Sequence, residues 1–190
     1  MTRTAIQGDF EVNAIAGAYG AEQCKLLRAA YKKRGWNQTA ISVRNHSYSM
    51  GSRMNVEIKR PDLVKDYAEA ARLANAAESI RRCEMMGEIL SGGNRYVSFE
   101  FSSEALEKIA APFLAASLAA LEKAAAGEES DIHEIAGTAF SLNVDGYDVK
   151  IWGESACEFC LNKHEGVAQS VAQRIGVRLF QVGCHPLQSK

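Results

Sequence analysis

Cysteine and histidine residues near the carboxyl end of the chain carry the donor atoms of a zinc site. Cys157 and Cys160 are separated by two residues, a spacing that suits two thiolates on one tetrahedral zinc ion. His164, Cys184 and His185 could supply the other ligands, but a predicted helix and a predicted strand separate them. The alternative is that the cysteines are reduced thiols without metal, which suits their odd number of five. We favour this alternative and predict no metal and no cofactor.

The sequence contains no arrangement of residues that is typical of a catalytic centre. The histidines stand in no recognised spacing to a serine or cysteine nucleophile; they are His46, His133, His164 and His185. No Walker-type or dinucleotide-binding run of glycines occurs either. We therefore expect that the protein is not an enzyme, and we keep an enzymatic or zinc-stabilised protein as a third hypothesis.

A basic segment between Cys24 and Arg60 is the strongest chemical signal in the chain. It holds nine basic residues against one acid, Glu57, so its formal charge is +8, whereas the whole chain has a formal charge of −1. Clustered like charge opposes folding and is typical of a surface that meets phosphate or an acidic partner. The candidate partner-binding residues are Lys32, Lys33, Arg34, Arg44, His46, Tyr48, Arg53, Lys59 and Arg60.

Two interpretations of these candidates stay open. In the first, the basic side chains contact phosphates while Tyr48 and His46 stack on bases, because stacking needs only an exposed aromatic face. In the second, Lys32, Lys33 and Arg34 complement the negative end of their helix, and the other cations pair with acids elsewhere in the chain. The first interpretation makes the partner a nucleic acid, a nucleoprotein or an acidic protein surface.

Hydrophobic periodicity places the basic segment on one helix and a β-hairpin. Residues 21–34 have the spacing of an amphipathic helix that Gly35 ends. Alternation of apolar and polar residues then predicts strands at Thr39–His46 and Met54–Lys59, joined by a polar link at Ser47–Ser52. One face of this hairpin is polar, so we expect it to face water.

The rest of the chain predicts an α+β fold in which antiparallel hairpins pack against Ala-rich helices. The further elements that we expect are helices at Asp62–Ser91, Ser103–Gly127 with a bend at Pro112, and Glu165–Ile175, and strands at Arg95–Phe101, Thr138–Val144, Tyr147–Trp152 and Val177–Val182. The strand–strand–helix–strand order then occurs twice, which suggests a duplicated β-β-α-β unit. We divide the chain at residue 127, into residues 1–127 and a smaller α+β region at residues 128–190, and expect the two to pack as one compact unit.

The run from Ser42 to Val56, Ser-Val-Arg-Asn-His-Ser-Tyr-Ser-Met-Gly-Ser-Arg-Met-Asn-Val, is followed across a helix by Gly93-Asn94-Arg95-Tyr96-Val97. This pattern resembles the large polyvalent protein associated domains of phages and conjugative plasmids, over roughly Thr39–Phe101. The resemblance implies an origin on a mobile element and a role such as countering host defence by CRISPR or restriction systems. It implies no catalytic residues.

These features together predict a small non-enzymatic binding protein, an inhibitor of a host-defence complex of anti-CRISPR type. Its partner would be a protein or nucleoprotein complex of host defence. The alternative is an accessory protein that binds nucleic acid without sequence preference. The amino terminus has no signal-peptide-like apolar stretch, and no run approaches the roughly 20 apolar residues that span a bilayer, so we expect a cytoplasmic protein with no membrane partner.

Overall fold

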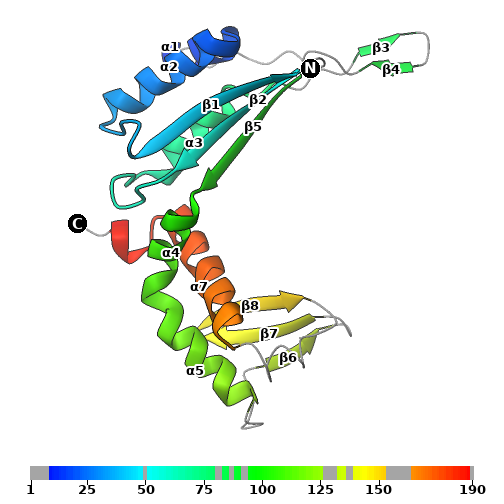
Figure 1. Ribbon diagram of the computed structural model, residues 1–190. Helices are drawn as coiled ribbons and strands as arrows, with labels where there is room; N and C mark the ends of the chain where they lie inside the picture. The colour runs from blue at the N-terminus through cyan, green and yellow to red at the C-terminus, as the bar shows by residue number, and fades with distance from the viewer. Residues whose placement is uncertain are drawn as a thin grey trace. The chain divides into compact units, whose positions relative to one another are not determined.

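The computed structural model describes most of the chain, and it divides into two compact units, Met1–Ser102 and Ser103–Lys190 (Figure 1). The described residues are 9–48, 51–79, 83–85, 88–90, 94–125, 132–135, 139–152 and 164–188. Helices and strands occur in both units, and antiparallel hairpins are present in each. The predicted α+β class is confirmed.

The first unit is built on a three-stranded sheet. Its elements are α1 (Phe10–Gly17), α2 (Gly20–Lys33), β1 (Ile41–Tyr48), β2 (Gly51–Ile58), α3 (Tyr67–Asn75), β3 (Cys83–Met85), β4 (Glu88–Leu90) and β5 (Asn94–Phe101). The sheet order is β1-β2-β5, in which β1 is antiparallel to β2 and β5 is parallel to β2. A parallel pair needs a crossover, and α3 lies in the connection that supplies it. Strands β3 and β4 pair only with each other among the described strands.

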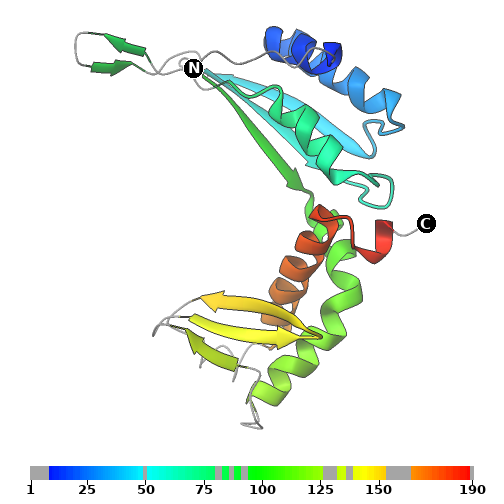
Figure 2. The ribbon, with the colours of Figure 1, turned by 180° about the vertical axis from the view of Figure 1, so that it is seen from behind.

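The apolar positions of this unit meet on one face of the sheet. Alternation buries Val43 of β1 and Val56 of β2 on the same side, where α2 and α3 contribute Leu27 and Leu73. Tyr31 of α2 is also buried there, and its hydroxyl donates a hydrogen bond of 2.9 Å to the Ala70 carbonyl of α3. Helix α3 is behind the strands in Figure 1 and in front of them in Figure 2. Among the described helices of this core, none therefore lies on the opposite face of the sheet.

The second unit packs α5 and α7 against an antiparallel meander, and α4 packs on α7. Its elements are α4 (Ser103–Ala110), the 3₁₀ turn η1 (Ala111–Phe113), α5 (Leu114–Ala125), β6 (Ile132–Ile135), β7 (Ala139–Val144), β8 (Tyr147–Trp152), α7 (His164–Gln181) and the 3₁₀ turn η2 (Pro186–Gln188). The sheet order is β6-β7-β8. Leu121, Leu142 and Val171 are buried in one core that joins α5, β7 and α7. The bend predicted at Pro112 is confirmed, because Pro112 lies in η1 between α4 and α5.

Two predicted elements near Ala-rich or Gly-containing stretches are wrong. The helix predicted at Asp62–Ser91 ends at Asn75, because the chain turns and Ser79 pairs with Arg95 of β5 by two backbone hydrogen bonds. The strand predicted at Val177–Val182 belongs mostly to α7, which continues through Gly176 to Gln181. The second strand–strand–helix–strand run therefore lacks the fourth strand that a duplication requires.

Other boundaries differ by less. Strand β1 continues to Tyr48 and β2 begins at Gly51, so the link of the first hairpin is shorter than the predicted Ser47–Ser52. The division predicted at residue 127 groups α4 and α5 with the first region, whereas both helices contact α7 and lie in the second unit. Among the described residues, no helix is both long enough and apolar enough to cross a bilayer.

Candidate nucleic-acid interface

The face of the first sheet opposite the core, which we call the open face, carries a polar and aromatic set of side chains. Its residues follow from the strand register; they are Ser42, Arg44, His46 and Tyr48 of β1, Gly51, Arg53, Asn55 and Glu57 of β2, and Asn94, Tyr96, Ser98 and Glu100 of β5. Side chains alternate between the two faces of a strand, so these positions lie opposite the buried Val43, Val56 and their neighbours. The open face is therefore a continuous surface across three strands.

Aromatic rings are exposed at one end of the open face. Tyr48 is 49% exposed and Tyr96 is 41% exposed. A Cβ atom at Gly51 would lie 3.4 Å from Cε2 of the Tyr48 ring and 2.4 Å from the Asn94 carbonyl oxygen, so this position of β2 admits only glycine without a shift. The Asn94 side-chain amide donates a hydrogen bond of 3.1 Å to the Tyr96 hydroxyl. Both tyrosine side chains are thus partly exposed beside the hairpin end.

Two arginines lie on the open face, Arg53 beside Tyr96 and Arg44 further along β1. Arg53 is aligned with His46 of β1 and Tyr96 of β5, and Arg44 is aligned with Asn55 of β2. Both arginines are exposed, and neither side chain has a hydrogen bond or an ion pair with any residue that the structure describes. Acids occur on the open face only at its other end, where Glu57 and Glu100 are paired across β2 and β5. Along the open face, the aromatic rings and Arg53 thus lie towards one end, Arg44 lies in the middle, and the acids lie at the other end.

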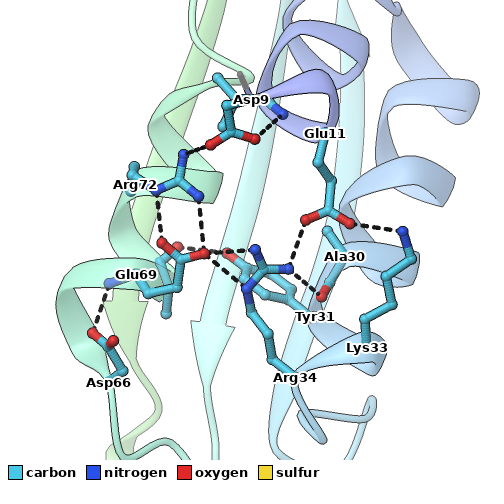
Figure 3. A network of polar contacts seen from close by, with 11 residues as sticks. Asp9, Glu11, Ala30, Tyr31, Lys33, Arg34, Asp66, Glu69 and Arg72 are labelled. Carbon is cyan, nitrogen blue, oxygen red and sulfur yellow. Dashed lines mark hydrogen bonds and ion pairs between the residues drawn. The ribbon is translucent and has the colours of Figure 1, made fainter. Parts of the chain in front are cut away.

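A network of ion pairs accounts for two other basic candidates (Figure 3). Lys33 and Arg34 both contact Glu11 of α1, at 2.9 Å and 2.7 Å, and Arg34 also contacts Glu69 of α3 at 2.6 Å. Arg72 pairs with Glu69 at 2.6 Å and with Asp9. Since these carboxylates accept charge-assisted hydrogen bonds, the network joins α1, α2 and α3 to one another.

The pKa shifts of the carboxylates in this network indicate a structural role. Hydrogen bonds from Lys33 and Arg34 hold the pKa of Glu11 below its usual value. Hydrogen bonds from Arg72 and then from Arg34 do the same to the pKa of Glu69, against the opposing effect of burial. The charged forms are stabilised on both sides, so neither carboxylate is poised to exchange a proton near neutral pH. Lys33 and Arg34 are already neutralised within the first unit.

The remaining basic candidates lie elsewhere. Arg60 makes a two-point contact with Asp62, at 2.7 Å and 3.0 Å. Lys59 follows β2 and is half-buried, and its backbone N–H donates to the Ala40 carbonyl. Lys32 is exposed and lines a cavity at the end of α2. Of the nine predicted residues, the structure brings four together on the open face: Arg44, His46, Tyr48 and Arg53.

The sequence prediction missed the contribution of β5. Tyr96 and Ser98 extend the open face beyond the hairpin, since β5 lies beside β2 with Tyr96 opposite Arg53. The sequence signal for this was the alternation within residues 95–101, which places Tyr96 on the side opposite Val97 and Phe99. Alternation does not show which strand lies beside β5 in the sheet.

Most of the predicted zinc ligands lie outside the described residues. This holds for Cys157 and Cys160 and for the side chain of His164, the first residue of α7. Both ring nitrogens of His185 are engaged, Nε2 with the Ile109 carbonyl at 2.9 Å and Nδ1 with the Leu187 N–H at 3.1 Å. Within the described part of the chain, no three Cys, His, Asp or Glu residues are grouped as metal ligands would be.

No family model matches the chain, and no curated protein or solved structure matches it either. The resemblance of residues 39–101 to the large polyvalent protein associated domains therefore stays a prediction. The chemistry of the open face is the feature from which a function can be argued.

Proposed function

We propose that the protein binds single-stranded nucleic acid on the open face of the β1-β2-β5 sheet, without dependence on base sequence. The observation that carries this proposal is that two arginines without a partner among the described residues share one face of the sheet with two exposed tyrosines. Proteins that bind single strands in this way combine cations for the backbone with aromatic rings on which bases stack. Arg44 and Arg53 would contact phosphates, and Tyr48 and Tyr96 would stack on bases.

The shape of the open face favours a single strand over a duplex. Neighbouring strands of a sheet are about 4.8 Å apart, and same-side residues along a strand are about 6.6 Å apart, so the rings and cations form a shallow two-dimensional array. Such an array can contact splayed bases but does not enter the major groove as a helix or a two-stranded ribbon does. Stacking on tyrosine accepts any base, so little sequence preference is expected.

The test is fluorescence anisotropy of a labelled 15-nucleotide DNA and the same RNA sequence, each titrated with the protein at several salt concentrations, with a duplex as comparison. Each phosphate neutralised on a single strand contributes about −0.7 to the slope of log affinity against log salt. If Arg44 and Arg53 each neutralise one phosphate, we expect a slope of about −1.4 or steeper. The single strands should bind more tightly than the duplex.

Variants separate stacking from charge. Tyr48→Ala or Tyr96→Ala should weaken binding by about 1–3 kcal/mol, roughly 5- to 150-fold, with little change in the salt slope. The double change Arg44→Gln/Arg53→Gln should flatten the slope by about 1.4. The matched control is Arg174→Gln/Arg178→Gln, which removes the same charge from exposed positions of α7 and should leave the slope unchanged.

Two results would overturn the proposal. One is the absence of any binding at low salt, which would leave the inhibitor of a host-defence complex, expected from the resemblance, as the hypothesis to pursue by capture of protein partners. The other is a result in which the open-face substitutions and the α7 control substitutions weaken binding equally. In that case the attraction would be a property of total charge rather than of the open face.

A further inference from the structure

A cavity of about 440 Å³ opens where α2 ends and β1 begins. Its lining residues come from the last turns of α2 and from the link to β1; they are Arg28, Ala29, Lys32, Asn37, Gln38 and Thr39. The volume lies in the range of small-molecule sites, about 300–1,000 Å³, and exceeds the space that one bound water or ion needs. None of the described residues that line the cavity is acidic.

The two cations of the cavity have no carboxylate partner among the described residues. Arg28 uses its Nη2 to donate a hydrogen bond to the Val43 carbonyl of β1, and its buried Nε has no hydrogen-bond partner in the described part of the chain. Lys32 lies one helical turn further on and is exposed. Like charges at positions i and i+4 of a helix repel each other, so an anion in the cavity would relieve this repulsion.

The link supplies further donors. The Oδ1 atom of Asn37 already accepts hydrogen bonds from the backbone N–H groups of Thr39 and Ala40, at 3.0 Å and 3.2 Å. This fixes the side chain and leaves its Nδ2 amide as a donor. Most of the cavity lining is apolar, and its polar part includes three donor groups: the Asn37 amide, the Lys32 ammonium group and the Arg28 guanidinium. Phosphate oxygens, which only accept, suit such a site.

We propose that this cavity binds the phosphate of one nucleotide and that this nucleotide belongs to the strand that crosses the open face. Val43, which anchors Arg28, is followed directly in β1 by Arg44 of the open face, about 3.3 Å further along the strand. Since β1 is an edge strand and α2 packs on the other side of the sheet, a nucleic-acid strand that passes from Arg44 around this edge would reach α2 and the cavity. If the phosphate belongs to the bound strand, this inference rests on the proposed function. A free nucleotide carries the same phosphate and is the other ligand that the test distinguishes.

The first arm of the test examines the cavity with a small probe. Adenosine 5′-monophosphate is titrated into the whole protein while backbone amide shifts are followed by two-dimensional NMR, with adenosine as the comparison that lacks the phosphate. We expect shifts at residues 37–39 with the monophosphate only, lost in Lys32→Gln. The control Lys25→Gln removes one exposed cation from the same helix, outside the cavity, and should keep the shifts.

The second arm uses the labelled 15-nucleotide strand. Lys32→Gln should flatten the salt slope by about 0.7, one phosphate, and Lys25→Gln should not. A flattened slope supports the cavity as a site on the path of the strand. Shifts with the monophosphate and an unchanged slope support the site with a free nucleotide as its ligand.

The proposal is overturned if Lys32→Gln affects neither the monophosphate shifts nor the slope. If the strand still binds through Arg44 and Arg53 in that case, the proposed function stands and only the cavity fails. If the strand does not bind at all while the monophosphate shifts depend on Lys32, the function fails and the cavity stands. Matching circular dichroism spectra of Lys32→Gln and Lys25→Gln confirm that both variants are folded.

Discussion

At the scale of single residues, the basic segment separates into two chemically different groups. Lys33 and Arg34 have acids of α1 and α3 within 2.9 Å, so their charge contributes to joining helices. Arg44 and Arg53 have no such partner among the described residues. Charged groups without partners remain hydrated and available to an external anion. A formal charge of +8 over the segment therefore overstates the charge that a partner meets.

His185 is the residue whose titration should be visible in stability. It is 1% exposed, and burial holds its pKa below the ordinary value. Because Nδ1 accepts from the Leu187 N–H, the proton of the neutral ring is on Nε2, which donates to the Ile109 carbonyl. A proton on Nδ1 would remove the hydrogen bond that this atom accepts from the Leu187 N–H. The folded state therefore prefers the neutral ring.

The sign of the pH dependence follows from this preference. The unfolded chain has a His pKa of about 6.5, so the stabilisation is complete above that pH and is lost as pH falls through 6.5 towards the lower folded pKa. We expect the free energy of unfolding of the second unit to fall between pH 7.5 and pH 5, measured by denaturant titration. In His185→Gln this part of the pH dependence should disappear. A constant difference in stability between the variant and the parent over that range would contradict the prediction.

At the scale of elements, the crossing of α4 and α7 depends on Gly176. A Cβ atom there would lie 2.4 Å from the Ile109 carbonyl oxygen and 2.5 Å from Cγ2 of the same residue. Gly176→Ala gains up to about 1 kcal/mol of helix propensity but introduces overpacking of about 1–3 kcal/mol against a backbone atom. We expect a net loss of about 1 kcal/mol in the free energy of unfolding, measured with urea.

Gly166 is the matched control for this change. It lies on the same helix, and a Cβ atom there would have no atom within 4 Å outside its own helix and chain neighbours. Gly166→Ala should therefore stabilise the protein by about 0.5–1 kcal/mol, through helix propensity alone. If Gly176→Ala were as stable as Gly166→Ala, the close approach to Ile109 would not be a packing constraint.

Gly176 also illustrates which elements the sequence could predict. Strands β1, β2 and β5 were predicted because alternation at positions such as Val43 and Val56 is a local signal. The end of α7 was not, because a glycine that allows another helix to approach has the same local signature as a glycine that ends a helix. The helix predicted to reach Ser91 failed for a related reason, since the pairing of Ser79 with Arg95 is a long-range contact.

The same limit applies to the candidate site. The hairpin pattern placed Arg44 on a polar face, but it put Tyr48 in the link Ser47–Ser52 and Arg53 before the second strand. The strands in fact pair as far as Tyr48 and Gly51, which brings Arg53, His46 and Tyr48 onto the same face. Tyr96 joins them only because β5 pairs with β2, and no local pattern specifies that neighbour. The removal of Lys33 and Arg34 from the set required the position of Glu11 and, for Arg34, also that of Glu69, far along the chain.

At the scale of the whole molecule, the proposed interface belongs to one unit. The open face, the cavity of Arg28 and Lys32, and the ion-pair network all lie within Met1–Ser102, which has its own hydrophobic core. A unit of about 100 residues buries enough apolar surface to fold without help from a second core. The first unit should therefore contain everything that single-strand binding requires.

This assignment predicts the behaviour of the two separate units. A chain of residues 1–102 should bind the 15-nucleotide strand with the salt slope of the whole protein, because the slope counts neutralised phosphates and those cations are all present. A chain of residues 103–190 should show no binding under the same conditions. Circular dichroism and thermal unfolding of each piece establish that it is folded before binding is compared. A folded first unit with a slope flatter by 0.7 or more would mean that the second unit contributes at least one phosphate contact, and the interface would then have to be extended beyond the open face.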